Sequence, residues 1–432
     1  MGKEISEQFY DFLTEDDEPR ACSSIPDEDC NHVPRNFSWN VLNGTASKLA
    51  EKIISPKLTL PWIFSYLGAA PIIIGALVPV KDAGSLLPQL IVSGRIRSQK
   101  IRKHYWTVAA LVQALCMLLS AWLVYQFKAG WVPWLLLVLL AIFSLASGVA
   151  SVAFKDVAAK TVPKGERGQM LSYRSTFGGL LALGAGLFLL FGIRGQGDQT
   201  VYALMFLAAA VLWFLAAFFF SRIKELPGAT KGGRNPVEEI KGGLALLKKD
   251  RGFRNFIIAR ALLMAIPLSQ PFYVVISRQL GEGGWSQIGY LILIAGLAQV
   301  VSAPFWGRFA DDSPRRLMRI VALISIAANL YALSFLWDFG LESFYWFLPV
   351  FFVHGIAYAG ARLSRKTYLV DYAPDEERPT YVSLANTLIG LFTLVAASFG
   401  FIAQYFGLAA QLYFFIALLI VNIFLSFRLK EV

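Results

Sequence analysis

Apolar segments long enough to cross a bilayer recur along almost the whole chain, from residue 37 to residue 428. A run of about 20 apolar residues crosses the hydrocarbon core as a helix, because a helix satisfies its own backbone hydrogen bonds. The expected spans lie near residues 37–60, 69–95, 105–127, 131–155, 169–193, 200–222, 254–277, 285–307, 315–337, 343–366, 380–404 and 408–428. The sequence therefore predicts an all-α integral membrane protein with twelve transmembrane helices.

Basic residues gather in alternate connections between these spans. The positive-inside rule places such connections in the cytoplasm, which predicts a multi-pass protein of the cell (inner or plasma) membrane with both termini cytoplasmic. The net charge of +11 does not indicate nucleic-acid binding, because the basic residues lie between apolar segments and form no tail or patch. The basic residues that set the orientation include Arg95, Arg97, Lys100, Arg102, Lys103, Lys160, Lys164, Arg167, Arg308, Arg315, Arg316, Arg319, Arg365, Lys366 and Arg378.

Two polar segments divide the chain. Residues 1–36 hold ten acidic and three basic residues, a net of −7 (3 − 10), and this composition predicts a disordered acidic cytoplasmic tail. Residues 223–253 contain several glycines and a basic run, and predict a cytoplasmic central loop. The sequence thus predicts an N-terminal six-helix bundle over 37–222 and a C-terminal six-helix bundle over 254–432.

The two predicted bundles repeat each other in sequence. Leu67-Gly68 and Gly94-Arg95 recur 213 residues later as Leu280-Gly281 and Gly307-Arg308. A second set recurs at a spacing of 211: Lys155, Pro163, Glu166, Arg167, Ser172, Gly179 and Leu180 return as Lys366, Pro374, Glu377, Arg378, Ser383, Gly390 and Leu391. A duplicated six-helix unit keeps one orientation in both copies, since six is even, and predicts pseudo-symmetric bundles about an axis along the membrane normal.

The connection Gly307–Arg316 resembles a known family signature. It is similar to the cytoplasmic Gly-x-x-x-Asp-Arg-x-Gly-Arg-Arg motif of the major facilitator superfamily, with Asp312 where Arg is usual and Pro314 near the expected Gly. The earlier copy, Gly94–Lys103, departs further, with Ser98 in place of the Asp. The resemblance implies a secondary transporter that works by alternating access, driven by an ion gradient, most simply of protons.

In that family the signature forms a charge latch between helices at the cytoplasmic side, which holds the outward-open state. The resemblance implies that Asp311, with Arg308, Arg315 or Arg316, plays this part, and it assigns Gly94, Arg95 and Gly307 to the same motif. The alternative is that these basic residues serve only to set the orientation of the chain.

Ionisable residues cluster inside the first two spans. An ionised side chain facing lipid costs about 2.5–3.5 kcal/mol on insertion scales, so such residues usually face a cavity or a partner. The cluster comprises Lys48, Glu51 and Lys52 of the first span, on a polar stripe that begins near Asn40, with Lys81 and Asp82 of the second. Three cations and two carboxylates leave one positive charge for an anionic substrate, while Glu51 and Asp82 are candidate proton carriers.

Two alternatives to a transport site stay open for this cluster. The charges can form an interhelical ion network that merely orders the first two spans. Alternatively, residues 38–52 form a surface helix and residues 53–80 form the first span. The repeat argues against the second alternative, because it places Leu67-Gly68 in a short outer loop.

Isolated polar residues also interrupt apolar stretches of the second half. Gln299, His354 and Asn386 are candidate substrate or coupling residues, although a lone histidine is often satisfied by a backbone carbonyl. Arg260 and Arg362 lie near expected span ends, where snorkelling is the simpler interpretation.

These patterns favour a secondary transporter of a small solute, with an anion favoured over a cation. Its partners would be that solute, a coupling ion and the lipid bilayer, and we expect a monomer without cofactor, metal or catalytic residues, and not an enzyme. Two other classes remain: a non-transporting relative that serves as an assembly factor or sensor, and a lipid flippase.

Overall fold

The computed structural model describes residues 31–191, 198–228, 246–281, 284–337, 343–374 and 377–432, with Gln8, Tyr10 and Leu13. Most of the predicted acidic tail and residues 229–245 of the predicted central loop lie outside these ranges, so the proposed domain boundaries stay predictions. Tyr10 packs against Phe37 at the start of the first span, and Leu13 belongs to the same apolar cluster.

The first six spans are formed by seven helices. They are α3 (Val33–Ile53) followed by α4 (Thr59–Tyr66), then α5 (Pro71–Arg97), α6 (Lys103–Gln126), α7 (Val132–Thr161), α8 (Glu166–Phe191) and α9 (Gln199–Ser221). The second six are formed by α11 (Arg251–Leu262) with α12 (Ala265–Gln279), then α13 (Trp285–Asp312), α14 (Pro314–Ser334), α15 (Phe344–Tyr372), α16 (Arg378–Ala396) with η1 (Ala397–Phe399), and α17 (Gly400–Ser426).

By length and apolarity alone, ten helical segments of the described chain are able to cross a membrane. One of them, Thr380–Ser426, has 47 residues, which as one straight helix would measure about 70 Å, twice the hydrocarbon thickness. It is broken at Gly407, whose φ of 87° lies in the left-handed region that glycine adopts without strain, and it supplies two spans. The remaining span is α3, which is too polar to be counted by composition. The predicted twelve-helix fold is confirmed.

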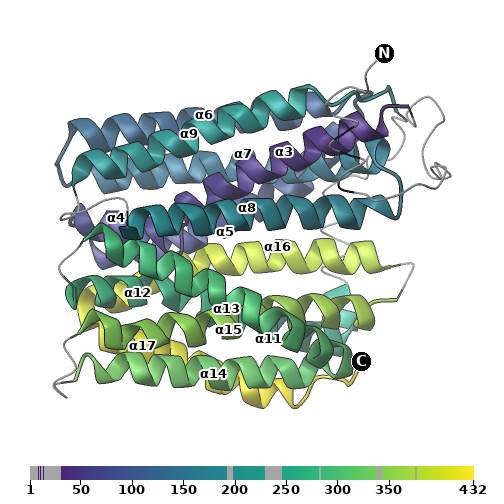
Figure 1. The fold of residues 1–432 in the computed structure, drawn as a ribbon. Helices are drawn as coiled ribbons and strands as arrows, with labels where there is room; N and C mark the ends of the chain where they lie inside the picture. The colour runs from purple at the N-terminus through teal and green to yellow at the C-terminus, as the bar shows by residue number, and fades with distance from the viewer. Residues whose placement is uncertain are drawn as a thin grey trace.

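The first six spans lie on one side of the molecule and the second six on the other (Figure 1). The two sets meet where α5 packs on α16 and where α8 packs on α13. The start of α3 and the C-terminal end of the chain lie at the same end of the bundle, whereas α4 and α12 lie at the opposite end (Figure 1). An even number of spans requires the two termini to share one side of the membrane.

Helix α3 packs inside the bundle and is not a surface helix. It contacts α8 and α9, and Asn36, Asn40 and Asn43 on it are fully buried. Asn43 donates a hydrogen bond to the backbone oxygen of Ala216 at 2.9 Å. The alternative in which residues 38–52 lie on the membrane surface is therefore wrong, and Leu67-Gly68 lies in the short turn between α4 and α5, as the repeat predicted.

A buried arginine bonded to asparagine ties the first and fifth spans of each half together. In the first half Arg174 on α8 donates to the backbone oxygen of Asn40 at 2.8 Å and to Oδ1 of Asn43 at 3.1 Å. In the second half Arg260 on α11 donates to Oδ1 of Asn386 on α16 at 2.9 Å. Arg260 is 8% exposed, so the snorkelling interpretation is wrong for it: its guanidinium is held inside the protein by the hydrogen bond to Asn386.

Close packing of α3 on α8 generates a test with a matched control. A Cβ on Gly178 would lie 2.6 Å from Cβ of Lys48, whereas a Cβ on the adjacent Gly179 meets nothing within 4 Å. We expect Gly178→Leu to destabilise the protein by about 1–3 kcal/mol through overpacking, and Gly179→Leu to leave stability within about 0.5 kcal/mol. Thermal unfolding of the purified protein checks this, and equal melting temperatures would contradict the packing of α3 on α8.

Asp250 caps the start of α11 and joins it to two other spans. Its carboxylate accepts hydrogen bonds from the backbone N–H of Phe253 at 3.0 Å and from the hydroxyls of Tyr372 at 2.6 Å and Tyr381 at 3.0 Å. Burial raises the pKa of this carboxyl, but the hydrogen bonds from Tyr372, Phe253 and Tyr381 outweigh burial and lower the pKa below its ordinary value of 3.8.

A lowered folded-state pKa means that Asp250 contributes stability above its unfolded pKa and loses it as the pH falls. We therefore expect Asp250→Asn to lower the melting temperature at pH 7, by an amount typical of a lost helix cap, about 1 kcal/mol. The difference from the native protein should close as the pH falls below about 4. Asp371→Asn, at an exposed carboxylate on α15, is the control, and a difference that does not change with pH would refute the assignment.

Candidate functional site

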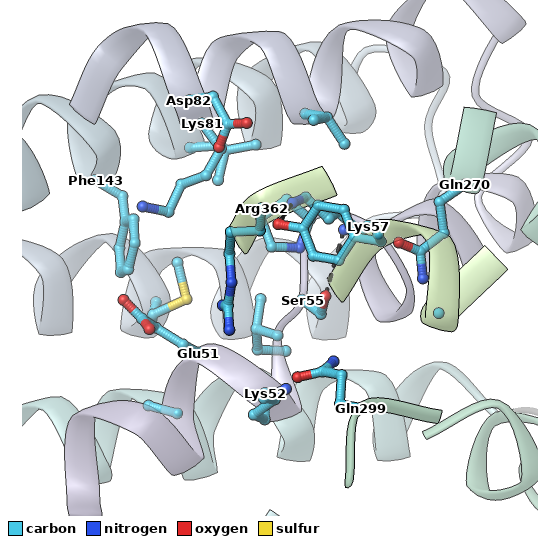
Figure 2. Close-up of a pocket in the computed structure, with 18 of the residues that line it drawn as sticks. Glu51, Lys52, Ser55, Lys57, Lys81, Asp82, Phe143, Gln270, Gln299 and Arg362 are labelled. Atoms are coloured by element: carbon cyan, nitrogen blue, oxygen red, sulfur yellow. Dashed lines mark hydrogen bonds between the residues drawn. The ribbon is translucent and has the colours of Figure 1, made fainter. Parts of the chain in front are cut away.

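A cavity of about 280 Å³ lies between the two halves. Helices α5, α6, α7 and α9 and the end of α3 line it from the first half, and α12, α13 and α15 line it from the second. Its polar lining consists of Glu51, Lys52, Ser55, Lys57, Lys81, Asp82, Gln270, Gln299, His354, Tyr358 and Arg362. Figure 2 shows Lys81 and Asp82 on one side, Glu51 and Lys52 on the other, and Arg362 reaching between them.

The first span is interrupted where it meets this cavity. Helix α3 ends at Ile53 and α4 begins at Thr59, and the segment between them contains Pro56, which cannot donate a backbone hydrogen bond. The break presents Lys57 to the second half, where its ammonium donates to the Tyr358 hydroxyl and lies 4.0 Å from the centre of the Tyr358 ring. The first span of the second half is also interrupted, between α11 and α12. In transporters, broken helices at mid-membrane commonly frame the substrate site.

The charges predicted from the first two spans come together at this cavity. Glu51, Lys52, Lys81 and Asp82 line it, and Lys48 forms an ion pair with Glu51 at 2.9 Å. The side chains of Lys48 and Glu51 are 46% and 34% exposed, which fits groups that face a hollow inside the bundle. Lys81 donates to the Ser147 hydroxyl at 3.3 Å, leaving its charge without a direct carboxylate partner among the described residues.

The lining carries a positive excess. Lys52, Lys57, Lys81 and Arg362 face Glu51 and Asp82, so the formal charge of the six ionisable groups is +2 (4 − 2). Uncompensated cations inside a membrane protein are costly and mark pathways for ions or charged solutes. The cavity is therefore suited to an anion.

His354 presents an unsatisfied polar group to the cavity. The residue is fully buried, and neither ring nitrogen has a hydrogen-bond partner within the described part of the chain. Its ring lies between those of Tyr273 and Tyr358, at centroid distances of 5.3 and 6.5 Å. The alternative of a satisfying backbone carbonyl is therefore wrong. An unmade hydrogen bond at a buried group costs about 1–3 kcal/mol, a cost that a bound solute or water would remove.

Three of the candidate residues do not line the cavity. Lys48 lies beside it and pairs with Glu51. Asn40, through its backbone oxygen, and Asn386, through its side chain, accept from Arg174 and Arg260 in the ties described above. Gln299 does line the cavity, from α13.

Sequence reasoning missed Lys57, Tyr358 and Arg362. The sequence placed Arg362 near a span end, and the structure adds that this residue lines the cavity. A signal for it was present: His354, Tyr358 and Arg362 follow one another at intervals of four residues, and side chains at that spacing share one face of a helix.

The connection between α13 and α14 is arranged differently from the predicted latch. Asp311 is exposed and forms no ion pair among the residues that the structure describes. Arg315 instead pairs with Glu431 near the end of the chain and donates to the backbone oxygen of Leu429 at 2.8 Å. The Ser313 hydroxyl donates to Glu431 at 2.7 Å, and this hydrogen bond, with the charge of Arg315, lowers the pKa of Glu431. The latch through Asp311 stays a prediction.

Comparisons with known proteins agree with this architecture. A family model described as Major Facilitator Superfamily matches residues 41–298 and 276–432. Multidrug resistance protein MdtG of Salmonella paratyphi C is 29% identical over 261 residues, which are 58% of this chain and 61% of that protein. An uncharacterized protein of Mycobacterium tuberculosis is 24% identical over 275 residues, 60% of this chain and 52% of that protein. The matched region thus spans about half to three fifths of these relatives.

Solved structures show the same fold at low sequence identity. The crystal structure of the nucleoside transporter NupG has a TM-score of 0.64 at 13% identity, covering 90% of this chain and 98% of that one. The crystal structure of a D-xylose-proton symporter has a TM-score of 0.67 at 15% identity, covering 91% and 97%.

Proposed function

The chain belongs to the Major Facilitator Superfamily, and on this premise we propose that it is a secondary transporter that moves a small anion across the membrane by alternating access, coupled to protons. The observation that carries the proposal is the cavity between the two halves, where four cations face two carboxylates. The family consists of transporters and not of enzymes, in keeping with a site that binds and releases a solute.

The distribution of contacts between the halves supports alternating access. At the end of the bundle with α4 and α12, the rings of Tyr202 and Trp285 lie 4.5 Å apart, and Arg278 donates to the Ser65 hydroxyl at 3.2 Å. At the opposite end, the ion pairs Lys160–Glu225 and Arg315–Glu431 each join residues of one half. If the basic connections are cytoplasmic, as the positive-inside rule predicts, this conformation is inward-facing in the inner or plasma membrane.

Lys57 and Arg362 give the anion a role in this movement. Lys57 belongs to the first half and Arg362 to the second, and both line the cavity. An anion bound in the cavity reduces the repulsion between these two cations at low dielectric, so its binding favours a conformation in which the halves close around it. The empty carrier is held instead by the bond from Lys57 to Tyr358.

Flux measurements with purified protein in liposomes test the anion assignment. We expect anionic solutes of a small panel to exchange faster than cationic and neutral ones. Arg362→Gln and Lys57→Gln should each lower anion exchange by about tenfold or more, because each removes a charged contact in the cavity. Lys128→Gln, at an exposed lysine outside the cavity, is the control. Preferred exchange of cations, or full exchange by both cavity variants, would exclude an anion carrier.

Proton coupling is assigned to the two cavity carboxylates. Glu51→Gln and Asp82→Asn remove the groups that are able to bind and release a proton during the cycle. We expect at least one of them to abolish uphill accumulation driven by a pH gradient while exchange without a gradient continues. Unchanged pH dependence in both variants would show that neither residue carries the coupled proton.

A further inference from the structure

A second hollow reaches Lys52 from the outer surface of the bundle. This crevice, of about 370 Å³, is lined by the end of α3, by α8 and α9, and by Ile292 of α13. Among the described residues that line it, Lys52 is charged and all the others are apolar. Lys52 also lines the central cavity, so the two hollows have this cation in common.

The crevice opens on a surface that faces lipid. Phe188 and Leu204 line it and are 64% and 53% exposed, as expected for side chains in contact with hydrocarbon. Apolar grooves are common on such a surface: a larger one, of about 560 Å³ beside Leu119 and Trp122, is lined entirely by uncharged residues. An apolar groove alone therefore indicates nothing. The cation at the inner end distinguishes the crevice beside Lys52.

The charge of Lys52 lacks a direct partner. In the part of the chain that the structure describes, Lys52 forms no ion pair. Two cations, Lys52 from the first half and Arg362 from the second, both line the central cavity. Their mutual repulsion is removed by an anionic group between them.

We propose that the transported anion is amphipathic and single-chained, with its anionic head in the cavity between Lys52 and Arg362 and its hydrocarbon chain in the crevice along α8 and α9. This inference rests on the proposed anion transport and narrows its substrate class. A chain that passes from the bilayer into the crevice stays in an apolar medium at little cost, whereas the head leaves the interface and requires compensating cations. The crevice therefore recognises the hydrocarbon chain of the solute, and Lys52 recognises its anionic head.

Photolabelling in phosphatidylcholine nanodiscs tests the position of the chain. The probe is decane-1-sulfonate with an aliphatic diazirine in its chain, which stays ionised at all working pH values. We expect label on the segments 182–189 and 201–208, mapped by mass spectrometry. Unlabelled decane-1-sulfonate should compete, and decyltrimethylammonium, with the same chain and the opposite charge, should not. Equal competition by the two would show an ordinary lipid groove and overturn the proposal.

Variants of the protein separate the contribution of the Lys52 charge to labelling from that of the shape of the crevice. Lys52→Gln should lower labelling by about tenfold, equivalent to one lost charged contact, and Lys52→Arg should retain it. Ala185→Trp fills the crevice and should remove the label, while Leu119→Trp makes the same kind of change in the uncharged groove and should not. Labelling that survives both Lys52→Gln and Ala185→Trp would refute the site.

Exchange of methanesulfonate, a small anion without a hydrocarbon chain, by the same variants distinguishes the amphipathic substrate from anion transport in general. Small-anion exchange that persists in Ala185→Trp while labelling is lost supports a chain site beside a working carrier. Small-anion exchange with no specific labelling in the native protein overturns the amphipathic substrate and leaves anion transport standing. Specific labelling without any anion exchange supports the binding site and overturns the transport function.

Discussion

The cost of an uncompensated charge inside a bilayer governs the arrangement of this protein. Every ionisable group at membrane depth requires a partner, water or a ligand to offset this cost, and the charged residues of this protein fall into two groups. Arg174 and Arg260 are buried and bonded to asparagines, and they join helices. Lys52, Lys81 and Arg362 line the cavity with too few carboxylates to balance them, and this imbalance is the basis of the proposed function.

The two halves join the same pair of helices with the same pair of residue types, but with the arginine and the asparagine on opposite helices. Each half ties its first span to its fifth with an arginine and an asparagine. The arginine is on the fifth span in the first half, as Arg174, and on the first span in the second half, as Arg260. Such a hydrogen bond joins the two helices equally well whichever of them carries the donor. The pairing of the helices was thus retained while the residues diverged.

The two halves contribute different kinds of residue to the cavity. The carboxylates Glu51 and Asp82 come from the first half, while His354, Tyr358 and Arg362 come from one face of α15 in the second. The interrupted first span delivers Lys57 across the boundary to Tyr358. A site assembled in this way changes when the halves move, which is the physical requirement for alternating access.

The sequence by itself determined the membrane spans, the duplication and the clustering of Glu51, Lys81 and Asp82. The length of an apolar segment and the spacing of a repeat can be read from the chain alone. The clustering follows because two consecutive spans are adjacent and antiparallel, which brings ionisable residues at similar membrane depth together. Only the tertiary structure decided that Asn386 accepts a hydrogen bond from Arg260 while Arg362 faces the cavity. A polar residue in an apolar segment gives the same sequence pattern whether it bonds to another helix or lines a cavity. The periodicity shows which face of its own helix a residue occupies, but not what that face packs against. Lys57 and Tyr358 are 301 residues apart, and their contact follows from the packing of the two halves.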